Sequence, residues 1–353
     1  MDWVRGAKIG HGSFGIVNLA IPTNQNCSKL MAVKSCGVAH SASLMNEKSI
    51  LDELKGCKEI ISCLGDCYSF ENGEKLYNVL LEYASCGNLA DKIKNSNDHR
   101  LPEIEVRQYT KAILGGLEFI HKNGYVHCDI KTQNILLGQN FEVKIADFGL
   151  AKRGHLKDMS ELRIELRGTP LYMSPEMVTG GEQGCPSDIW ALGCVVVEMI
   201  TGVPAWRCSN MASLLMKIGV GEQVPEIPGD LSDELKDFLG KCFEKDPKSR
   251  PTAKMLLDHP FLVNINCADH DSVTLKDFRK LPSTSPRCPF DFPNWVSGHS
   301  SITYSNMSSP SSTTDFDWSG GKSSSTVAER LKGLVCKQGL DWSVGDDDWV
   351  TIR

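Results

Sequence analysis

A glycine-rich segment near the N-terminus is the first place where residue type and spacing suggest chemistry. Gly10, Gly12 and Gly15, followed by Val17, form a GxGxxGxV pattern. Because glycine has no side chain, backbone N–H groups at such positions can close over phosphate oxygens. An ordinary glycine turn between two strands gives the same pattern, and for the segment alone it is the better interpretation. The segment therefore predicts a phosphate site only if other residues support it.

Two charged residues in the next part of the chain provide that support. Lys34 lies in a β-branched run seventeen residues after Val17, and Glu47 follows thirteen residues later in a segment with helical spacing. A carboxylate on such a helix can hold the lysine ammonium against phosphate. A lone Lys–Glu pair would mean little without further residues that suit phosphate chemistry.

Two polar clusters of that kind occur in the second third of the chain. The run from His127 to Asn134 reads His-Cys-Asp-Ile-Lys-Thr-Gln-Asn, and Asp147-Phe148-Gly149 begins eighteen residues after Asp129. Acidic and amide oxygens are the ligands that Mg²⁺ prefers, and a further carboxylate is needed to orient an attacking hydroxyl. The clusters therefore hold the residue types that a metal-assisted transfer to a hydroxyl requires.

In order and spacing, these motifs resemble the eukaryotic protein kinase family over about residues 3–262. Ser-Pro-Glu at 174–176 stands where that family has Ala-Pro-Glu, and Ser-Asp-Ile-Trp-Ala-Leu-Gly at 187–193 follows. The resemblance implies an α+β, bilobal kinase fold, with a small β-rich N-lobe over 3–83 and a larger helical C-lobe over 84–262. It also implies a buried ion pair between Glu176 and Arg250.

The resemblance also implies a role for each matching residue. Lys34, paired with Glu47, would hold the α- and β-phosphates of ATP. Asp129 would orient the substrate hydroxyl, and Lys131 would steady the γ-phosphate. Mg²⁺ would be held by Asn134 and Asp147. The implied ATP site comprises the glycine-rich segment, apolar residues around the adenine and the backbone of the hinge: Ile9, Gly10, His11, Gly12, Ser13, Phe14, Gly15, Ile16, Val17, Ala32, Lys34, Glu82, Ala84 and Leu136, with Leu81 behind the adenine. For the apolar members, plain core packing is an alternative.

Two short motifs indicate the substrate class. Lys131 stands two residues after Asp129, and Gly-Thr-Pro at 168–170 precedes Ser-Pro-Glu; both resemble serine/threonine kinases rather than tyrosine kinases. The runs around these motifs resemble MEKK-type mitogen-activated protein kinase kinase kinases, particularly short plant members with an N-terminal kinase domain. That resemblance implies a MAP kinase kinase as the protein substrate, in stress or hormone signalling. The alternatives are a Ser/Thr kinase outside that cascade and an inactive kinase fold that serves as a scaffold.

Cys128 departs from the family pattern, which usually has arginine between the histidine and aspartate of this run. That guanidinium normally pairs with a phosphorylated activation loop, and a neutral thiol cannot. We therefore expect activity to depend less on phosphorylation at the two candidate activation-loop sites, Ser160 and Thr169. Arg167 or Lys152 is an alternative phosphate partner, although a solvated basic loop is the favoured interpretation of these two residues. A redox role for the thiol has no local feature to support it.

The elements that must position these residues can be predicted from hydrophobic periodicity. Residues 3–83 are strand-like, with β-branched runs at 31–34 and 77–82, and one helix is expected over 43–54. Helical patterns dominate from 84 to 262, for example at 103–121 and 186–201. The apolar stretch 191–197 is too short for a bilayer span, which needs about 20 residues, and it is expected to be a buried helix.

The last part of the chain, residues 263–353, has a different composition. Residues 297–326 contain 12 Ser and 4 Thr with hardly any aliphatic side chains, which cannot offset the entropy of ordering a backbone. We expect a mostly disordered regulatory or interaction tail in which 327–335 could form a short helix. Its end, Trp349-Val350-Thr351-Ile352 after three aspartates, resembles motifs that add as a strand to autophagy ubiquitin-like proteins; an inert terminus is the alternative.

Composition sets outer limits on the function. The chain has 353 residues, 41% of them hydrophobic, which is enough for about two folded units. A net charge of −6, from 38 basic and 44 acidic residues, argues against nucleic acid as the main partner. The 14 cysteines form no CxxC pair or zinc pattern, as expected in a reducing compartment. With no signal-peptide pattern, a soluble cytoplasmic or nuclear protein without membrane insertion is expected.

Overall fold

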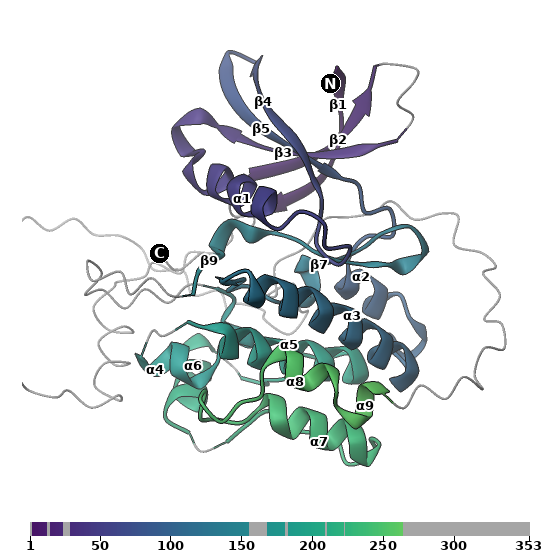
Figure 1. Ribbon diagram of the computed structural model, residues 1–353, viewed down its shortest axis with the longest axis vertical. Helices are drawn as coiled ribbons and strands as arrows, with labels where there is room; N and C mark the ends of the chain where they lie inside the picture. The colour runs from purple at the N-terminus through teal and green to yellow at the C-terminus, as the bar shows by residue number, and fades with distance from the viewer. Residues whose placement is uncertain are drawn as a thin grey trace, which may run out of the picture.

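The computed structural model describes residues 2–12, 15–23, 29–154, 168–180, 183–208, 210–221 and 223–263. Several residues and segments with a predicted role lie outside the described residues: Ser13, Phe14, Ser160, Arg167 and the predicted tail after residue 263, including 327–335 and 349–352. In the part that the structure describes, a strand-rich lobe is followed by a helical lobe, and Figure 1 shows the strands β1 to β5 at one end of the molecule and the helices α2 to α9 at the other. The predicted bilobal α+β fold is confirmed.

The N-lobe is an antiparallel five-stranded sheet with the strand order β1-β2-β3-β5-β4. Its strands are β1 (Trp3–Gly12), β2 (Gly15–Pro22), β3 (Met31–Gly37), β4 (Cys63–Glu71) and β5 (Glu74–Glu82). Strands β1 and β2 form a hairpin in which Gly12 pairs with Gly15, so the glycine-rich segment is the hairpin tip. Gly15 has a φ of 149°, and a Cβ there would lie 2.5 Å from the Ser35 carbonyl oxygen. Close packing of β2 against β3 therefore requires glycine at this position.

Helix α1 (Ala42–Glu53) lies against one face of this sheet, near the predicted bounds of 43–54. Its buried residues Leu44, Glu47, Ile50 and Leu51 follow the three-to-four-residue spacing of one helix face. A carboxylate among three apolar residues needs a charged partner, because an unpaired buried charge is expensive. That partner is Lys34 of β3.

The other face of the sheet carries a small apolar cluster formed by Ala20, Met31, Val33 and Leu80. Beside it, Arg5 of β1 donates two hydrogen bonds to Glu71 of β4, at 2.7 Å and 2.8 Å, and one to the buried Asn78 side chain at 2.8 Å. Because β1 and β4 are the two edge strands, this side chain ties the edges of the sheet together.

The C-lobe helices are α2 (Leu89–Lys94), α3 (Glu103–Lys122), α4 (Pro175–Gly180), α5 (Cys185–Thr201), α6 (Met211–Gly219), α7 (Asp233–Cys242), α8 (Ala253–Leu257) and α9 (Pro260–Val263). Helix α5 is buried at every position from Ser187 to Met199, which confirms the predicted buried helix. At Gly193 a Cβ would lie 2.8 Å from both the Cys242 Cβ and the Phe243 ring, so glycine lets α7 pack closely. No helix in the described part of the chain is long and apolar enough to cross a membrane.

Two short ribbons were not predicted from the sequence. β6 (Tyr125–Val126) pairs with β9 (Lys152–Arg153), and β7 (Ile135–Leu137) pairs with β8 (Val143–Ile145). Segments of two or three residues are too short to show a hydrophobic periodicity, so they cannot be recognised within a region where helical patterns dominate. They matter for the site because residues 127–134, here called the catalytic segment after the role expected from the sequence, lie between β6 and β7, and Asp147 follows β8.

Candidate active site

A cluster of one ammonium and two carboxylates lies where β3, α1 and the end of β8 meet. The Lys34 Nζ atom is 2.6 Å from Glu47 Oε2 and 2.9 Å from Asp147 Oδ1. Burial alone would lower the pKa of Lys34, but the charges of Asp147 and Glu47 outweigh it and raise that pKa. Burial works to raise the pKa of Asp147 as well, yet the Lys34 ammonium holds it below its ordinary value. Lys34 and Asp147 are therefore both charged near neutral pH.

Asp147 has an uncommon backbone conformation at this junction of the two lobes, which is here called the cleft. Its φ of 65° lies in the left-handed region, which costs a non-glycine residue about 1–3 kcal/mol. Phe148 supplies the restraint, because its ring is fully buried and its N–H donates to Glu47 Oε1 at 3.3 Å. A Cβ added to Gly12 would lie 4.0 Å from Asp147 Oδ2, so the β1–β2 hairpin covers this carboxylate.

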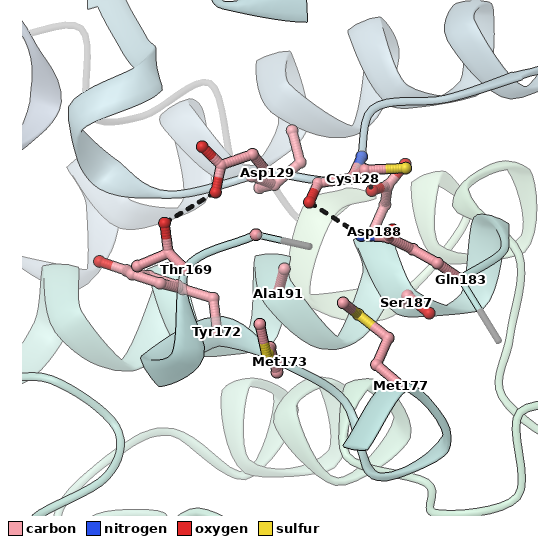
Figure 2. A pocket seen from close by; sticks show the side chains of 12 residues that line it. Cys128, Asp129, Thr169, Tyr172, Met173, Met177, Gln183, Ser187, Asp188 and Ala191 are labelled. Atoms are coloured by element: carbon pink, nitrogen blue, oxygen red, sulfur yellow. Dashed lines mark hydrogen bonds between the residues drawn. The ribbon is translucent and has the colours of Figure 1, made fainter. Parts of the chain in front are cut away.

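The catalytic segment brings a second set of polar groups together around Asp129. Lys131 Nζ lies 2.8 Å from Asp129 Oδ2, and Asn134 Nδ2 donates to the same oxygen at 3.0 Å. The Thr169 hydroxyl donates to Asp129 Oδ1 at 2.8 Å and accepts from Lys131 Nζ at 3.0 Å; Figure 2 shows Thr169 and Asp129 pointing toward one another. Contacts with three side chains thus fix the direction of one carboxylate. The Asn134 amide nitrogen is used in doing so, which turns its oxygen to other ligands.

Asp188, at the start of α5, holds the backbone that presents Asp129. Its carboxylate accepts from the N–H of His127 at 2.9 Å and of Cys128 at 3.0 Å, and it lies 2.8 Å from His121 Nε2. Although burial works to raise the pKa of Asp188, these donors hold it below its ordinary value. Cys128 takes a φ of 69° there, and its carbonyl accepts from Gln183 Nε2 at 2.9 Å (Figure 2).

His127 connects the catalytic segment to the Asp147 region. The N–H of Asp129 donates to His127 Nδ1 at 3.2 Å, so Nε2 carries the proton and donates to the Ala146 carbonyl at 3.1 Å. Burial lowers the pKa of His127, which keeps the ring neutral. The ring also packs edge-on against Phe148, with 4.7 Å between centroids. Asp129 and Asp147 are therefore held by one continuous set of contacts.

The residues expected around the adenine separate into two groups. Ala32 and Leu81 are buried in the main apolar cluster, and Ile9, Val17 and Leu136 are partly buried against it. Ile16 alternates with Val17 on β2 and is 43% exposed, so its side chain faces away from that cluster. The other expected positions lie on the elements that frame the cleft: Gly10 and His11 on β1, Glu82 at the end of β5, and Ala84 two residues later.

The donor set suits a metal ion that arrives with phosphate. In the part of the chain that the structure describes, no group of three or more His, Cys, Asp and Glu side chains could hold a metal by itself. Asp147 and the Asn134 oxygen are two hard oxygen donors, and Mg²⁺ typically binds one or two such protein donors together with substrate phosphates and water. The residues therefore fit a magnesium–nucleotide complex better than a free resident metal.

Comparison with known proteins agrees with this geometry. A family model described as "Protein kinase domain" matches residues 3–262. The chain belongs to the protein kinase family. It is 47% identical to "Mitogen-activated protein kinase kinase kinase 20" of Arabidopsis thaliana over the full length of both chains. It is 36% identical to "Mitogen-activated protein kinase kinase kinase 17" of the same plant, over all of this chain and 93% of that protein. It is also 36% identical to the Saccharomyces cerevisiae "Serine/threonine-protein kinase BCK1/SLK1/SSP31", over 73% of this chain and 18% of that protein.

Protein kinases generally use ATP with Mg²⁺, and this kinase departs from the family at Cys128. The thiol is buried and donates to the Val126 carbonyl at 3.5 Å, inside the catalytic segment. Lys152, the alternative phosphate partner that the structure describes, lies on the exposed β9 strand.

Several residues that order this kinase site could not be assigned a role from the sequence. Asp188 belongs to the 187–193 motif, which assigns it no role, and no motif marks His121 or Gln183. A second buried carboxylate, Glu198, accepts from the hydroxyls of Thr132 at 3.0 Å and Tyr172 at 2.5 Å. Each is one side chain on a helix or loop, so only the folded geometry reveals its partner.

The expected ion pair in the C-lobe is confirmed. Arg250 lies 2.8 Å and 3.1 Å from the two oxygens of Glu176, and its side chain is fully buried. Its N–H groups also donate to the carbonyls of Pro186 at 2.7 Å and Glu244 at 2.8 Å. Because Glu176 lies in α4, this pair braces the segment that follows Thr169.

Proposed function

We propose that this chain is an active serine/threonine kinase of the MAP kinase kinase kinase type, which transfers the γ-phosphate of ATP to Ser or Thr of a MAP kinase kinase. One observation carries the proposal: the continuous set of contacts from Lys34 through Asp147 and His127 to Asp129 and Thr169. Positioning and charge neutralisation are what phosphoryl transfer needs from a protein.

In the proposed reaction, the substrate hydroxyl donates a hydrogen bond to Asp129 while its oxygen attacks the γ-phosphorus. The new O–P bond forms as the bond to the β-phosphate oxygen breaks, Asp129 takes the hydroxyl proton, and ADP leaves. Lys131 lies beside this carboxylate and neutralises charge on the γ-phosphate, and Lys34 does so on the α- and β-phosphates. Asn134 and Asp147 would hold Mg²⁺, which supplies charge neutralisation to the phosphates.

The substrate class rests on the relatives. A match over the whole length of a relative named as a MAP kinase kinase kinase, at 47% identity, includes the tail as well as the kinase domain. We further propose a cytoplasmic or nuclear setting, because no disulfide joins the ten cysteines that the structure describes, as expected in a reducing compartment.

A substrate panel tests the proposal. Purified full-length protein is incubated with Mg²⁺-ATP and, separately, inactive MAP kinase kinases, unrelated kinases and a generic protein substrate. We expect phosphate on Ser or Thr of the MAP kinase kinases in preference to the others. Asp147→Asn serves as the matched control, and equal signal from this variant would identify a contaminating kinase.

The two alternatives predict different results in the same panel. A Ser/Thr kinase outside the cascade would label the generic substrate as well as the MAP kinase kinases. An inactive scaffold would label none of them, although Lys34, Glu47, Asp129, Lys131 and Asp147 are all present and paired in this structure. A chain that binds MAP kinase kinases without phosphorylating them would overturn the proposed function.

A further inference from the structure

A largely buried ion pair joins the end of β5 to β8. Lys144 Nζ lies 2.9 Å from Glu82 Oε1, and the two side chains are 13% and 16% exposed. The same oxygen accepts from the N–H of Ser62 at 3.0 Å, while the N–H of Glu82 donates to the Ser62 carbonyl at 2.9 Å. Glu82 is thus held by three contacts, two with Ser62 and one with Lys144. Lys144 is the partner that comes from the C-lobe.

Lys144 stands on the ribbon that carries both proposed magnesium ligands. On β7, Leu136 is its direct cross-strand partner, and Asn134 immediately precedes β7. Asp147 follows β8, and the N–H of Ala146 donates to the Asn134 carbonyl at 2.9 Å. The ribbon therefore holds Asn134 and Asp147 together as one unit, with Leu136 beside them as the expected floor of the adenine site.

The hinge, residues 82–84, is the expected partner of the adenine ring, whereas Asn134 and Asp147 are the expected partners of the metal-bound phosphates. Backbone hydrogen bonds tie β8 to residues 59–61, from Ile61 N to Ile145 O at 2.9 Å and from Ile145 N to Glu59 O at 2.7 Å. The Glu82–Lys144 pair adds a direct side-chain tie between the hinge and the ribbon. A nucleotide has a limited length between base and phosphates, so the separation of these two units decides whether both ends bind at once.

We propose that Lys144 is a positioning residue that sets this separation and so couples adenine binding to phosphate and metal binding. The inference rests on the proposed function for its ligand, MgATP. Lys144 touches neither reacting atoms nor, in the proposed arrangement, the nucleotide itself. It acts through Glu82 on one side and through its own strand on the other.

The test measures binding, so it does not depend on turnover. Calorimetry on the full-length protein compares a non-hydrolysable MgATP analogue, which engages both units, with adenosine, which engages only the hinge. Lys144→Met keeps the chain length and removes the charge. We expect its Kd for the analogue to rise about tenfold while its Kd for adenosine changes less than about twofold. Lys144→Arg, which restores a cation, should recover most of the affinity.

A matched control separates this effect from general loss of an ion pair. Lys241 pairs with Asp237 within α7, away from the ribbon, with side chains 42% and 57% exposed, and Lys241→Met should leave both Kd values unchanged. Thermal melting checks that each variant is folded. Equal weakening of adenosine and the analogue in Lys144→Met would show that the lysine only shapes the hinge, and unchanged affinities would show no positioning role; either result overturns the inference. A wild type that binds MgATP but transfers no phosphate would overturn the proposed function alone.

Discussion

The kinase contains two buried ion clusters that differ in how completely their charges are matched. In the C-lobe, one guanidinium meets one carboxylate, and N–H groups of Arg250 also have carbonyl partners. In the cleft, one ammonium, Lys34, meets two carboxylates, and one of them, Asp147, is 26% exposed. The balanced cluster is suited to hold the fold, whereas the cluster with surplus negative charge is suited to receive a cation.

The largest effect is expected from breaking the balanced pair. Arg250→Met leaves the Glu176 carboxylate without its cation, which costs about 3–5 kcal/mol of folding stability. The melting temperature should fall by about 6–20 °C, measured by differential scanning calorimetry. The control is Lys241→Met, which breaks an exposed ion pair with Asp237 in the same lobe and should shift melting by no more than about 4 °C. An Arg250 variant that melts like the wild type would remove the contrast between the clusters.

The opposite result is expected in the cleft. Asp147→Asn removes the surplus carboxylate while the Lys34–Glu47 pair remains, so the melting temperature should be unchanged or higher. Turnover should fall by about 10²- to 10³-fold, because an electrostatic contact made to the reacting phosphates is lost. Steady-state kinetics and melting on the same preparation check both. A variant that loses stability together with activity would mean that this cluster also serves mainly to hold the fold.

Sequence patterns could predict the charged residues of the site but not the contacts that orient them. Lys34 and Glu47 lie on a strand and a helix with clear periodicity, and Asp129 and Asp147 belong to motifs with fixed spacing, so their elements could be predicted. Asp188 and Gln183 act through the backbone of Cys128, and that contact depends on the left-handed φ of one residue. Local patterns do not encode which helix N-terminus will lie under which loop, so this part required the fold.

A smaller effect on turnover is expected one contact away from the cleft cluster. Thr169→Val keeps the shape of the side chain and removes both hydrogen bonds that join it to Asp129 and Lys131. Misdirecting Asp129 should lower kcat by on the order of 10²-fold, whereas Thr169→Ser should stay near the wild type. Because the neutral Cys128 thiol cannot replace arginine as a phosphate partner, both Ser160→Ala and the phosphatase-treated wild type should stay within about twofold of the untreated wild type. Collapse of turnover in Ser160→Ala would show that the loop needs its phosphate in spite of the thiol.

The smallest effect is expected at the Arg5–Glu71 pair of the N-lobe. This pair is balanced in charge, like Arg250 and Glu176, but it is partly exposed, like Asp147. The hydrogen bonds from Arg5 lower the pKa of Glu71 to about 2 from an ordinary 4.5. A depressed pKa in the folded state means that the carboxylate stabilises the protein fully above pH 4.5, and that this contribution is lost as pH falls from 4.5 toward 2. Glu71→Gln should therefore melt about 2–4 °C below the wild type at pH 7, with the gap closing as the pH falls from about 4.5 to about 3. If the difference in melting temperature does not change with pH, the stabilisation comes from the neutral hydrogen bonds around Asn78. The charge of this pair would then contribute neither to holding the fold nor to binding a cation.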